Sequence, residues 1–91
     1  MCVTKATIRG ATNGSVVHAD IVISCTANNN AYSPANYVWT NEVDGFQSTG
    51  PLFLLKPGSR YKLTCNASNN FHDHKDECYA TDYVEFNSKL L

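Results

Sequence analysis

Two cysteines and one tryptophan, carried on three short alternating segments, constrain the fold of this chain more than any other feature. The segments read Ile21-Val-Ile-Ser-Cys25, Tyr37-Val-Trp39 and Tyr61-Lys-Leu-Thr-Cys65. Side chains alternate between the two faces of a strand, so three such strands aim both cysteines and the tryptophan at a common interior. A disulfide between Cys25 and Cys65, covered by Trp39, is the simplest arrangement that satisfies all three.

The same alternation predicts which neighbours share the inward faces. They are Ile21 and Ile23 on the first segment, Tyr37 on the second, and Tyr61 and Leu63 on the third. We therefore expect a core built around Trp39, Ile23, Tyr61 and Leu63.

This spacing of cysteine, tryptophan and cysteine, in a chain of short strands, resembles the immunoglobulin superfamily over nearly the whole chain. The resemblance implies one all-β domain over residues 1–91, a two-sheet antiparallel β-sandwich of about seven strands in a compact C2- or I-like layout. One position departs from the family. The corner tyrosine that normally stands two residues before the second cysteine is replaced by Leu63, with Tyr61 two residues earlier. The usual corner hydrogen bond is therefore not assumed.

Turn residues divide the chain into the expected strands. Asn13-Gly14, Asp44-Gly45 and Pro57-Gly58 are typical of tight turns. The predicted strands are Cys2–Arg9 and Ser15–His18 as two halves of the first, then Asp20–Thr26, Asn36–Val43, Phe46–Ser48, Pro51–Leu55, Arg60–Ala67 and Tyr79–Asn87.

A second fold resemblance is weaker. The segments Tyr37-Val-Trp39 and Lys56-Pro-Gly58, the latter followed by Tyr61, look somewhat like a polycystic-kidney-disease repeat. That repeat is also an extracellular β-sandwich, but its Gly-Asp-Gly turn after the tryptophan is absent here. Both resemblances imply the same compartment.

Cysteine usage indicates the compartment independently. Four cysteines in 91 residues, with no Cys-x-x-Cys pair of the kind that zinc sites use, favour disulfides and an oxidising, extracellular setting. In an immunoglobulin sandwich the N-terminus lies at the same end as the loop before the last strand. The resemblance therefore implies a second disulfide between Cys2 and Cys78. The alternative is that Cys2 is free or pairs with a neighbouring domain.

Several function classes lack support. The formal net charge is −1 and the basic residues are scattered, which gives no reason to expect nucleic acid as a partner. No apolar run approaches a membrane span, and the start at Met1-Cys2 looks like a domain taken from a longer, membrane-anchored protein. No nucleophile elbow or phosphate-binding loop is present, so we expect no enzyme activity and no cofactor.

The segment His72–Glu77 contains two histidines and three carboxylates, which are metal-ligand types. Nothing in the pattern orders them, and a solvated loop of mixed charge is the preferred interpretation, so no metal site is predicted. The sequence also holds two glycosylation sequons, Asn13-Gly-Ser15 and Asn66-Ala-Ser68.

The resemblance leaves two functional hypotheses. The first is a cell-surface adhesion or recognition domain that binds a protein, with a second copy of itself as a specific case. The second is a structural spacer that has no ligand. Under the first hypothesis, we expect the partner to bind the outward face of the three strands that contain Trp39, Cys65 and Tyr83, or the adjoining loops. The candidate residues are Val38, Thr40, Lys62, Thr64, Thr81 and Tyr83 on the face, and Tyr32 and Phe71 in the loops.

Overall fold

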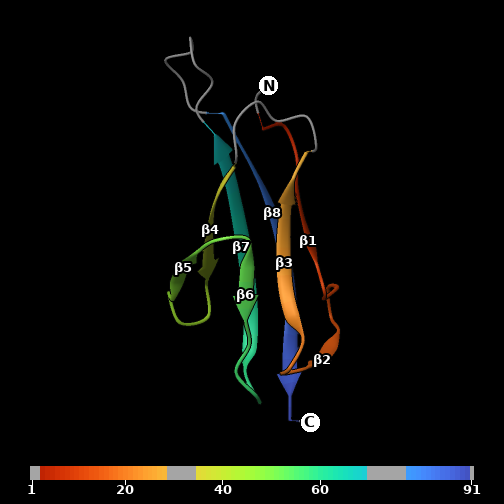
Figure 1. Ribbon diagram of the computed structural model, residues 1–91. Coiled ribbons are helices and arrows are strands. Elements are labelled where there is room, and N and C mark those ends of the chain that lie inside the picture. Colours follow the sequence, from red (N-terminus) through yellow and green to blue (C-terminus); the bar gives the residue numbers. More distant parts are fainter. Residues whose placement is uncertain (1–2, 29–34, 70–77, 91) are drawn as a thin grey trace.

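The computed structural model describes residues 3–28, 35–69 and 78–90, and in these ranges the chain forms strands and no helix (Figure 1). Turns carrying glycine separate most of the strands. In chain order the strands are β1 (Ala6–Arg9), β2 (Val16–His18), β3 (Val22–Ala27), β4 (Asn36–Asn41), β5 (Gln47–Thr49), β6 (Leu52–Leu54), β7 (Arg60–Asn69) and β8 (Cys78–Lys89).

The strands form two sheets, which confirms the predicted all-β sandwich. The small sheet has the order β1-β3-β6, and the large sheet has the order β2-β8-β7-β4-β5. Neighbouring strands are antiparallel with one exception, the parallel pair of β2 and β8. The molecule is elongated, 47 × 24 × 18 Å, and β7 and β8 run side by side along its length (Figure 1). The large sheet therefore offers a long outer surface.

The predicted first strand divides between the two sheets. Its first half, β1, pairs with β3 in the small sheet, and its second half, β2, pairs with β8 in the large sheet. Gly10 lies where the chain leaves β1, at a φ of 107° that favours glycine. A β-carbon there would lie 3.0 Å from Ile23 Cδ1 and 3.2 Å from the Val22 carbonyl oxygen. Glycine thus permits both the bend and the close approach of the backbone to β3.

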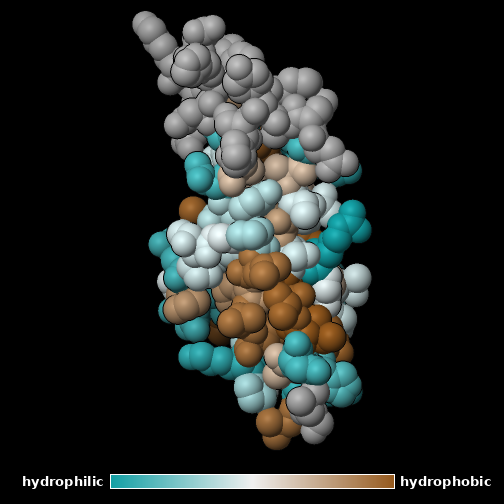
Figure 2. All heavy atoms as spheres, viewed as in Figure 1, coloured by the Kyte–Doolittle hydropathy of each residue, from teal (hydrophilic) through white to brown (hydrophobic). Residues whose placement is uncertain are grey.

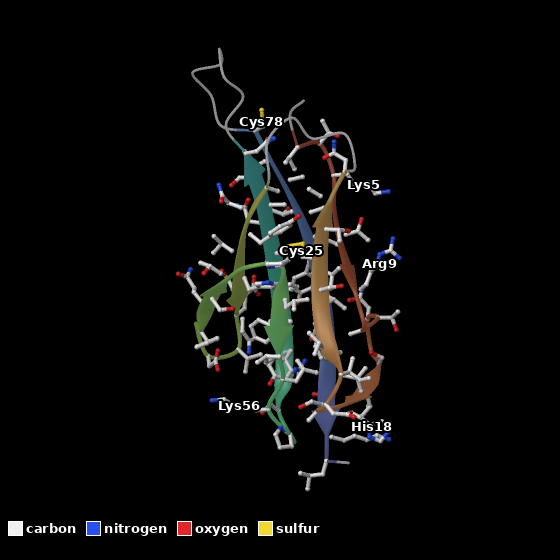
Figure 3. The ribbon with its side chains drawn as sticks, in the orientation of Figure 1. Lys5, Arg9, His18, Cys25, Lys56 and Cys78 are labelled. Carbon is white, nitrogen blue, oxygen red and sulfur yellow. A yellow bond between two sulfur atoms is a disulfide. The ribbon has the colours of Figure 1, made fainter. Side chains whose placement is uncertain are left out.

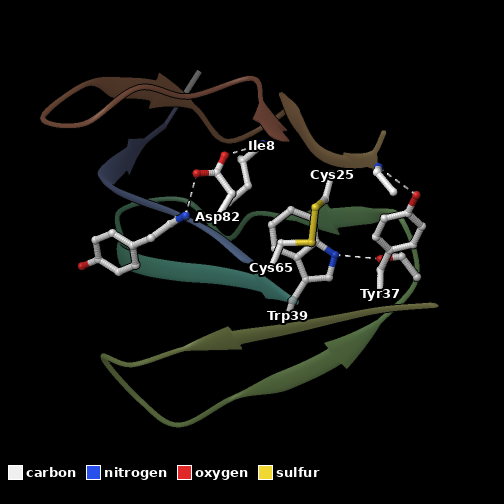
Figure 4. The surroundings of a disulfide bond; sticks show 9 residues. Ile8, Cys25, Tyr37, Trp39, Cys65 and Asp82 are labelled. Carbon is white, nitrogen blue, oxygen red and sulfur yellow. Dashed lines mark hydrogen bonds between the residues drawn. A yellow bond between two sulfur atoms is a disulfide. The ribbon is translucent and has the colours of Figure 1, made fainter. Parts of the chain in front are cut away.

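The four residues predicted at the centre of the core, Trp39, Ile23, Tyr61 and Leu63, are buried. Cys25 and Cys65 form a disulfide between the two sheets, and Trp39 packs beside it, fully buried (Figure 4). The indole Nε1–H donates to the Gly50 carbonyl at 2.8 Å, which satisfies the one polar group of this buried ring. The buried core also includes Val3, Ala6, Phe53, Ala67, Val84 and Phe86.

One predicted core residue is wrong. Ile21 is 40% exposed because it lies before β3, in a turn where its N–H donates to the His18 carbonyl at 3.0 Å. The strand consequently begins at Val22 rather than at Asp20. Tyr37, predicted inward, is half-buried, and its hydroxyl accepts the Ala27 N–H at 3.2 Å (Figure 4).

Several strand ends differ from the prediction by a few residues. The strand predicted to reach Val43 ends at Asn41, because the Asn41 side chain accepts the Val43 N–H and its carbonyl accepts the Gly45 N–H, which turns the chain. The next strand starts at Gln47 instead of Phe46. For the remaining strands the structure gives bounds that differ slightly from the predicted ones. It has Val16–His18 where Ser15–His18 was predicted, Leu52–Leu54 where Pro51–Leu55 was predicted, and Arg60–Asn69 where Arg60–Ala67 was predicted. It also has Cys78–Lys89 where Tyr79–Asn87 was predicted, and Ala6–Arg9 in the described part of the predicted strand Cys2–Arg9.

A corner hydrogen bond is present although the usual corner position holds Leu63. The Tyr61 hydroxyl accepts the Lys56 N–H at 2.6 Å, five residues upstream and just before β7. Ser88 on β8 supports the same turn, since its hydroxyl accepts the Ser59 N–H at 3.0 Å and donates to the Lys56 carbonyl. Tyr61 thus fastens the turn that precedes β7.

Candidate functional site

The outer face of the large sheet brings the predicted surface residues together. Alternation along β7 buries Tyr61, Leu63 and Cys65, so the residues between them face outward. The strand register then sets three cross-strand rows on this face. They are Val38 with Asn66 and Thr81, Thr40 with Thr64 and Tyr83, and Lys62 with Glu85.

All six predicted face residues therefore share one surface, which we call the recognition face (Val38, Thr40, Lys62, Thr64, Thr81 and Tyr83). Tyr79 extends it toward the end of the sandwich, opposite Ser68. Tyr79 is 64% exposed, and within the recognition face Tyr83 is 41% and Val38 39% exposed. Tyrosine on an exposed surface is a frequent anchor of protein contacts, because it combines a large apolar ring with a hydroxyl.

A cluster of Arg60, Glu85 and Tyr83 lies toward the end of this face that is away from Tyr79. Arg60 donates to the Glu85 carboxylate at 2.7 Å, and the Tyr83 hydroxyl donates to the same carboxylate at 3.3 Å. The hydrogen bond from Arg60 lowers the pKa of Glu85. Partial burial of the hydroxyl, followed by the nearby Glu85 charge, raises the pKa of Tyr83. Tyr83 is therefore neutral at physiological pH and keeps its hydroxyl as a donor.

A shallow depression of about 420 Å³ lies beside this group, lined by Asn13, Gly14, Arg60, Tyr83, Glu85, Phe86 and Asn87. The Asn13 side chain accepts the Glu85 N–H at 3.0 Å, and the Gly14 N–H donates to the Glu85 carbonyl at 2.8 Å. These two bonds hold the turn before β2 against β8. The one carboxylate of its lining, Glu85, is paired with Arg60.

The two sequons lie in different settings. Asn13 is exposed, and its side-chain oxygen holds the turn just described. Asn66 is exposed in the middle of β7, where the strand register places it on the recognition face.

A second surface was not anticipated from the sequence. Val22, Leu52 and Leu54 lie on the outer face of the small sheet, where Val22 is opposite Leu54, and all three are exposed. Figure 2 shows apolar side chains gathered over β6 and the adjoining strand β3. We call these three residues the apolar patch. The signal was present in the run Leu52–Leu55, because alternation cannot turn four consecutive apolar side chains inward.

Another candidate residue, Cys78, lies at one end of the molecule (Figure 3). Cys78 begins β8 there, and its side chain is buried and disulfide-bonded. Its predicted partner, Cys2, lies outside the described residues, as do Tyr32, Phe71 and the segment His72–Glu77. Among the residues that are described, no group of three or more His, Cys, Asp or Glu could hold a metal ion.

Basic side chains are dispersed over the described surface. In Figure 3, Lys5 and Arg9 point outward on one side of the molecule, and His18 and Lys56 lie toward its other end. No helix in the described ranges is long and apolar enough to cross a membrane. Comparison of the chain with protein-family models, with curated proteins and with solved structures finds no match.

Proposed function

We propose that this chain is an immunoglobulin-like, extracellular recognition domain that binds a protein partner through the recognition face. The single observation that carries the proposal is the convergence of Tyr79, Tyr83 and Val38, with a row of threonines, on one uncovered face of the large sheet. Exposed aromatic residues on a rigid, flat support lose little entropy on binding.

The setting supports the same proposal. The Cys25–Cys65 disulfide and the disulfide-bonded Cys78 suit an oxidising, extracellular compartment. The order of strands in the two sheets is compatible with a compact immunoglobulin-like domain. The molecule measures 47 × 24 × 18 Å, so one long side of it is of the size needed for a standard interface, which buries about 800 Å² on each partner.

The specific case we put forward is homophilic adhesion between copies on opposed surfaces. The test is aggregation of beads that display the native ectodomain with its glycans. Thr64→Arg places a long cation in the middle of the recognition face, and Tyr83→Ala removes an aromatic anchor. Both variants should abolish clumping. The matched control is Thr26→Arg, an equivalent change at an exposed position of the small sheet.

Clumping that survives both face variants contradicts the proposed face. No clumping of the native beads at high display density contradicts the homophilic case and leaves a different protein as partner. The segments 29–34 and 70–77, which lie outside the described residues, are the other candidate contact, and loss of clumping on Tyr32→Ala or Phe71→Ala alone assigns binding to them.

A second candidate function is a structural spacer within a larger ectodomain. The observation that favours it is the apolar patch, because an exposed aliphatic surface suits packing against another protein domain. Two sequons also suit a spacer, since glycans shield the surface. A spacer would show no clumping and no loss of binding with any recognition-face variant.

A further inference from the structure

Asn66 occupies an unusual place for a glycosylation sequon. It lies in the middle of a regular strand, with Ala67 buried beneath the sheet and Ser68 half-buried beside it. The Asn66 side chain is exposed on the recognition face, and no described residue forms a hydrogen bond with it. The amide nitrogen is therefore open to solvent and has no structural duty that a modification would disturb.

The surface beside Asn66 has the chemistry of a sugar-binding floor. Val38 is directly opposite Asn66 on β4, and Tyr79 is directly opposite Ser68 on β8. Together with Asn66 and Ser68, these two exposed apolar residues line a shallow hollow of about 360 Å³. The C–H face of a pyranose ring packs well on the face of an aromatic ring, whose π-electrons attract the weakly positive hydrogens.

We propose that Asn66 carries an N-linked glycan, and that its first sugar lies in the hollow against Tyr79 and Val38. In the modification the Asn66 Nδ2 attacks C1 of an oligosaccharide carried on a polyprenyl pyrophosphate. The Nδ2–C1 bond forms, the bond from C1 to the pyrophosphate oxygen breaks, and the amide proton is lost to a base of the transferase. The hollow then holds the attached chain close to the sheet.

The other sequon supplies an internal comparison. The Asn13 side-chain oxygen already accepts the Glu85 N–H, and Asn13 lies by the depression that contains the Arg60–Glu85 pair. The lining of that depression includes Tyr83, but its hydroxyl donates to Glu85. A glycan at Asn13 would meet a polar, internally bonded surface instead of the apolar floor near Asn66.

A glycan at Asn66 also has a consequence that rests on the proposed function. Asn66 is in the row next to Thr64 and Tyr83, so a glycan there covers part of the recognition face. The unmodified protein should bind its partner more tightly than the glycosylated one. Glycosylation thereby sets how much of the face is open to a partner.

The first test is glycopeptide mass spectrometry of the full chain secreted from a eukaryotic cell. Peptide N-glycosidase F releases the glycan and leaves aspartate at the modified position, which identifies the site. We expect modification at Asn66, lost in both Asn66→Gln and Ser68→Ala. An unmodified Asn66 peptide in the secreted protein overturns the proposal. A modified Asn13 peptide in the same digest would show that the cell's transferase acted on this chain.

The second test concerns the position of the first sugar in the hollow. Release of the glycan from the folded protein by the same glycosidase should be several-fold faster in Tyr79→Ala than in the native chain. After denaturation the two should release it at the same rate. Equal release rates from the two folded proteins would contradict the proposal that the first sugar lies against Tyr79. Clumping of beads carrying Asn66→Gln is measured separately, so failure of adhesion leaves the mass-spectrometric result intact.

Discussion

The Asp82 carboxylate on β8 accepts the backbone N–H of Ile8 on β1 at 2.7 Å, and so joins the two sheets by a polar contact (Figure 4). Its other oxygen accepts the Tyr83 N–H at 2.9 Å. Ile8 belongs to the outermost strand of the small sheet, whose free backbone edge would otherwise lack a partner. A charged acceptor makes this a stronger hydrogen bond than one between neutral groups.

Asp82→Ala should therefore lower the free energy of unfolding by about 1.5–3 kcal/mol, the usual contribution of a hydrogen bond to a charged group. Urea denaturation measures the loss. The control is Asp20→Ala at an exposed position, with an expected change within about 0.5 kcal/mol. Hydrogen exchange at the Ile8 amide should accelerate only in the Asp82 variant. Equal stability of the two variants would show that the contact contributes nothing.

Tyr61→Phe tests the corner hydrogen bond. The ring should stay buried, where it stacks on Phe86 with centroids 5.2 Å apart, while the bond to the Lys56 backbone is lost. We expect a loss of about 1 kcal/mol in the free energy of unfolding, the typical net value of one hydrogen bond. Thermal or urea unfolding checks this value. Tyr79→Phe removes an exposed hydroxyl and should leave stability unchanged, and an equal loss in both variants contradicts a special role for the corner.

Replacing Cys25 and Cys65 together by alanine should cost about 4 kcal/mol. The disulfide closes a sequence separation of 40 residues, and the estimate follows from the chain entropy that such a crosslink removes from the unfolded state. This is a large part of the roughly 5–15 kcal/mol that stabilises a typical domain. Denaturant unfolding of the double variant measures the loss, and a midpoint equal to that of the native protein would contradict the estimate.

Much of the core followed from the sequence because Cys25, Trp39 and Cys65 lie on segments with clear alternation, and alternation decides which face is buried. The prediction that Ile21 faces inward was wrong because the alternating pattern does not show where a strand begins. The turn bond from its N–H to His18 decides that point, and it depends on how the preceding segment docks on β8.

The surface was predicted unevenly for a similar reason. The positions of Thr64 and Tyr83 on one face followed from alternation, but their place in a single row depends on the register between β7 and β8. The salt bridge between Arg60 and Glu85 depends on that register too. The apolar run that contains Leu54 shows no alternation of apolar and polar side chains. Only the pairing of β6 with β3 therefore determines which residue of the run faces inward.

The Arg60–Glu85 contact should give a pH-dependent contribution in the acidic range. Because Arg60 lowers the pKa of Glu85, the folded state favours the carboxylate. Its stabilising effect is present above the ordinary pKa of 4.5 and is lost as pH falls through the lowered value. NMR titration of the Glu85 carboxyl should show the lowered midpoint in the native protein and a higher one in Arg60→Gln. An unchanged midpoint in that variant would remove Arg60 as the cause.

Strand β6 allows a direct test of alternation, because adjacent residues there should respond in opposite ways. Phe53 is 4% exposed, and its ring lies 5.5 Å from that of Trp39 and 5.8 Å from that of Tyr61. Phe53→Ala should lower the free energy of unfolding by about 3–5 kcal/mol, from lost burial and the cavity left behind. Leu54 is 75% exposed, so Leu54→Ala should change it by no more than about 0.5 kcal/mol. Denaturant unfolding of both variants decides the matter. A large loss for Leu54→Ala would mean that the apolar patch is already covered in solution, and a small loss for Phe53→Ala would contradict the register between β6 and β3.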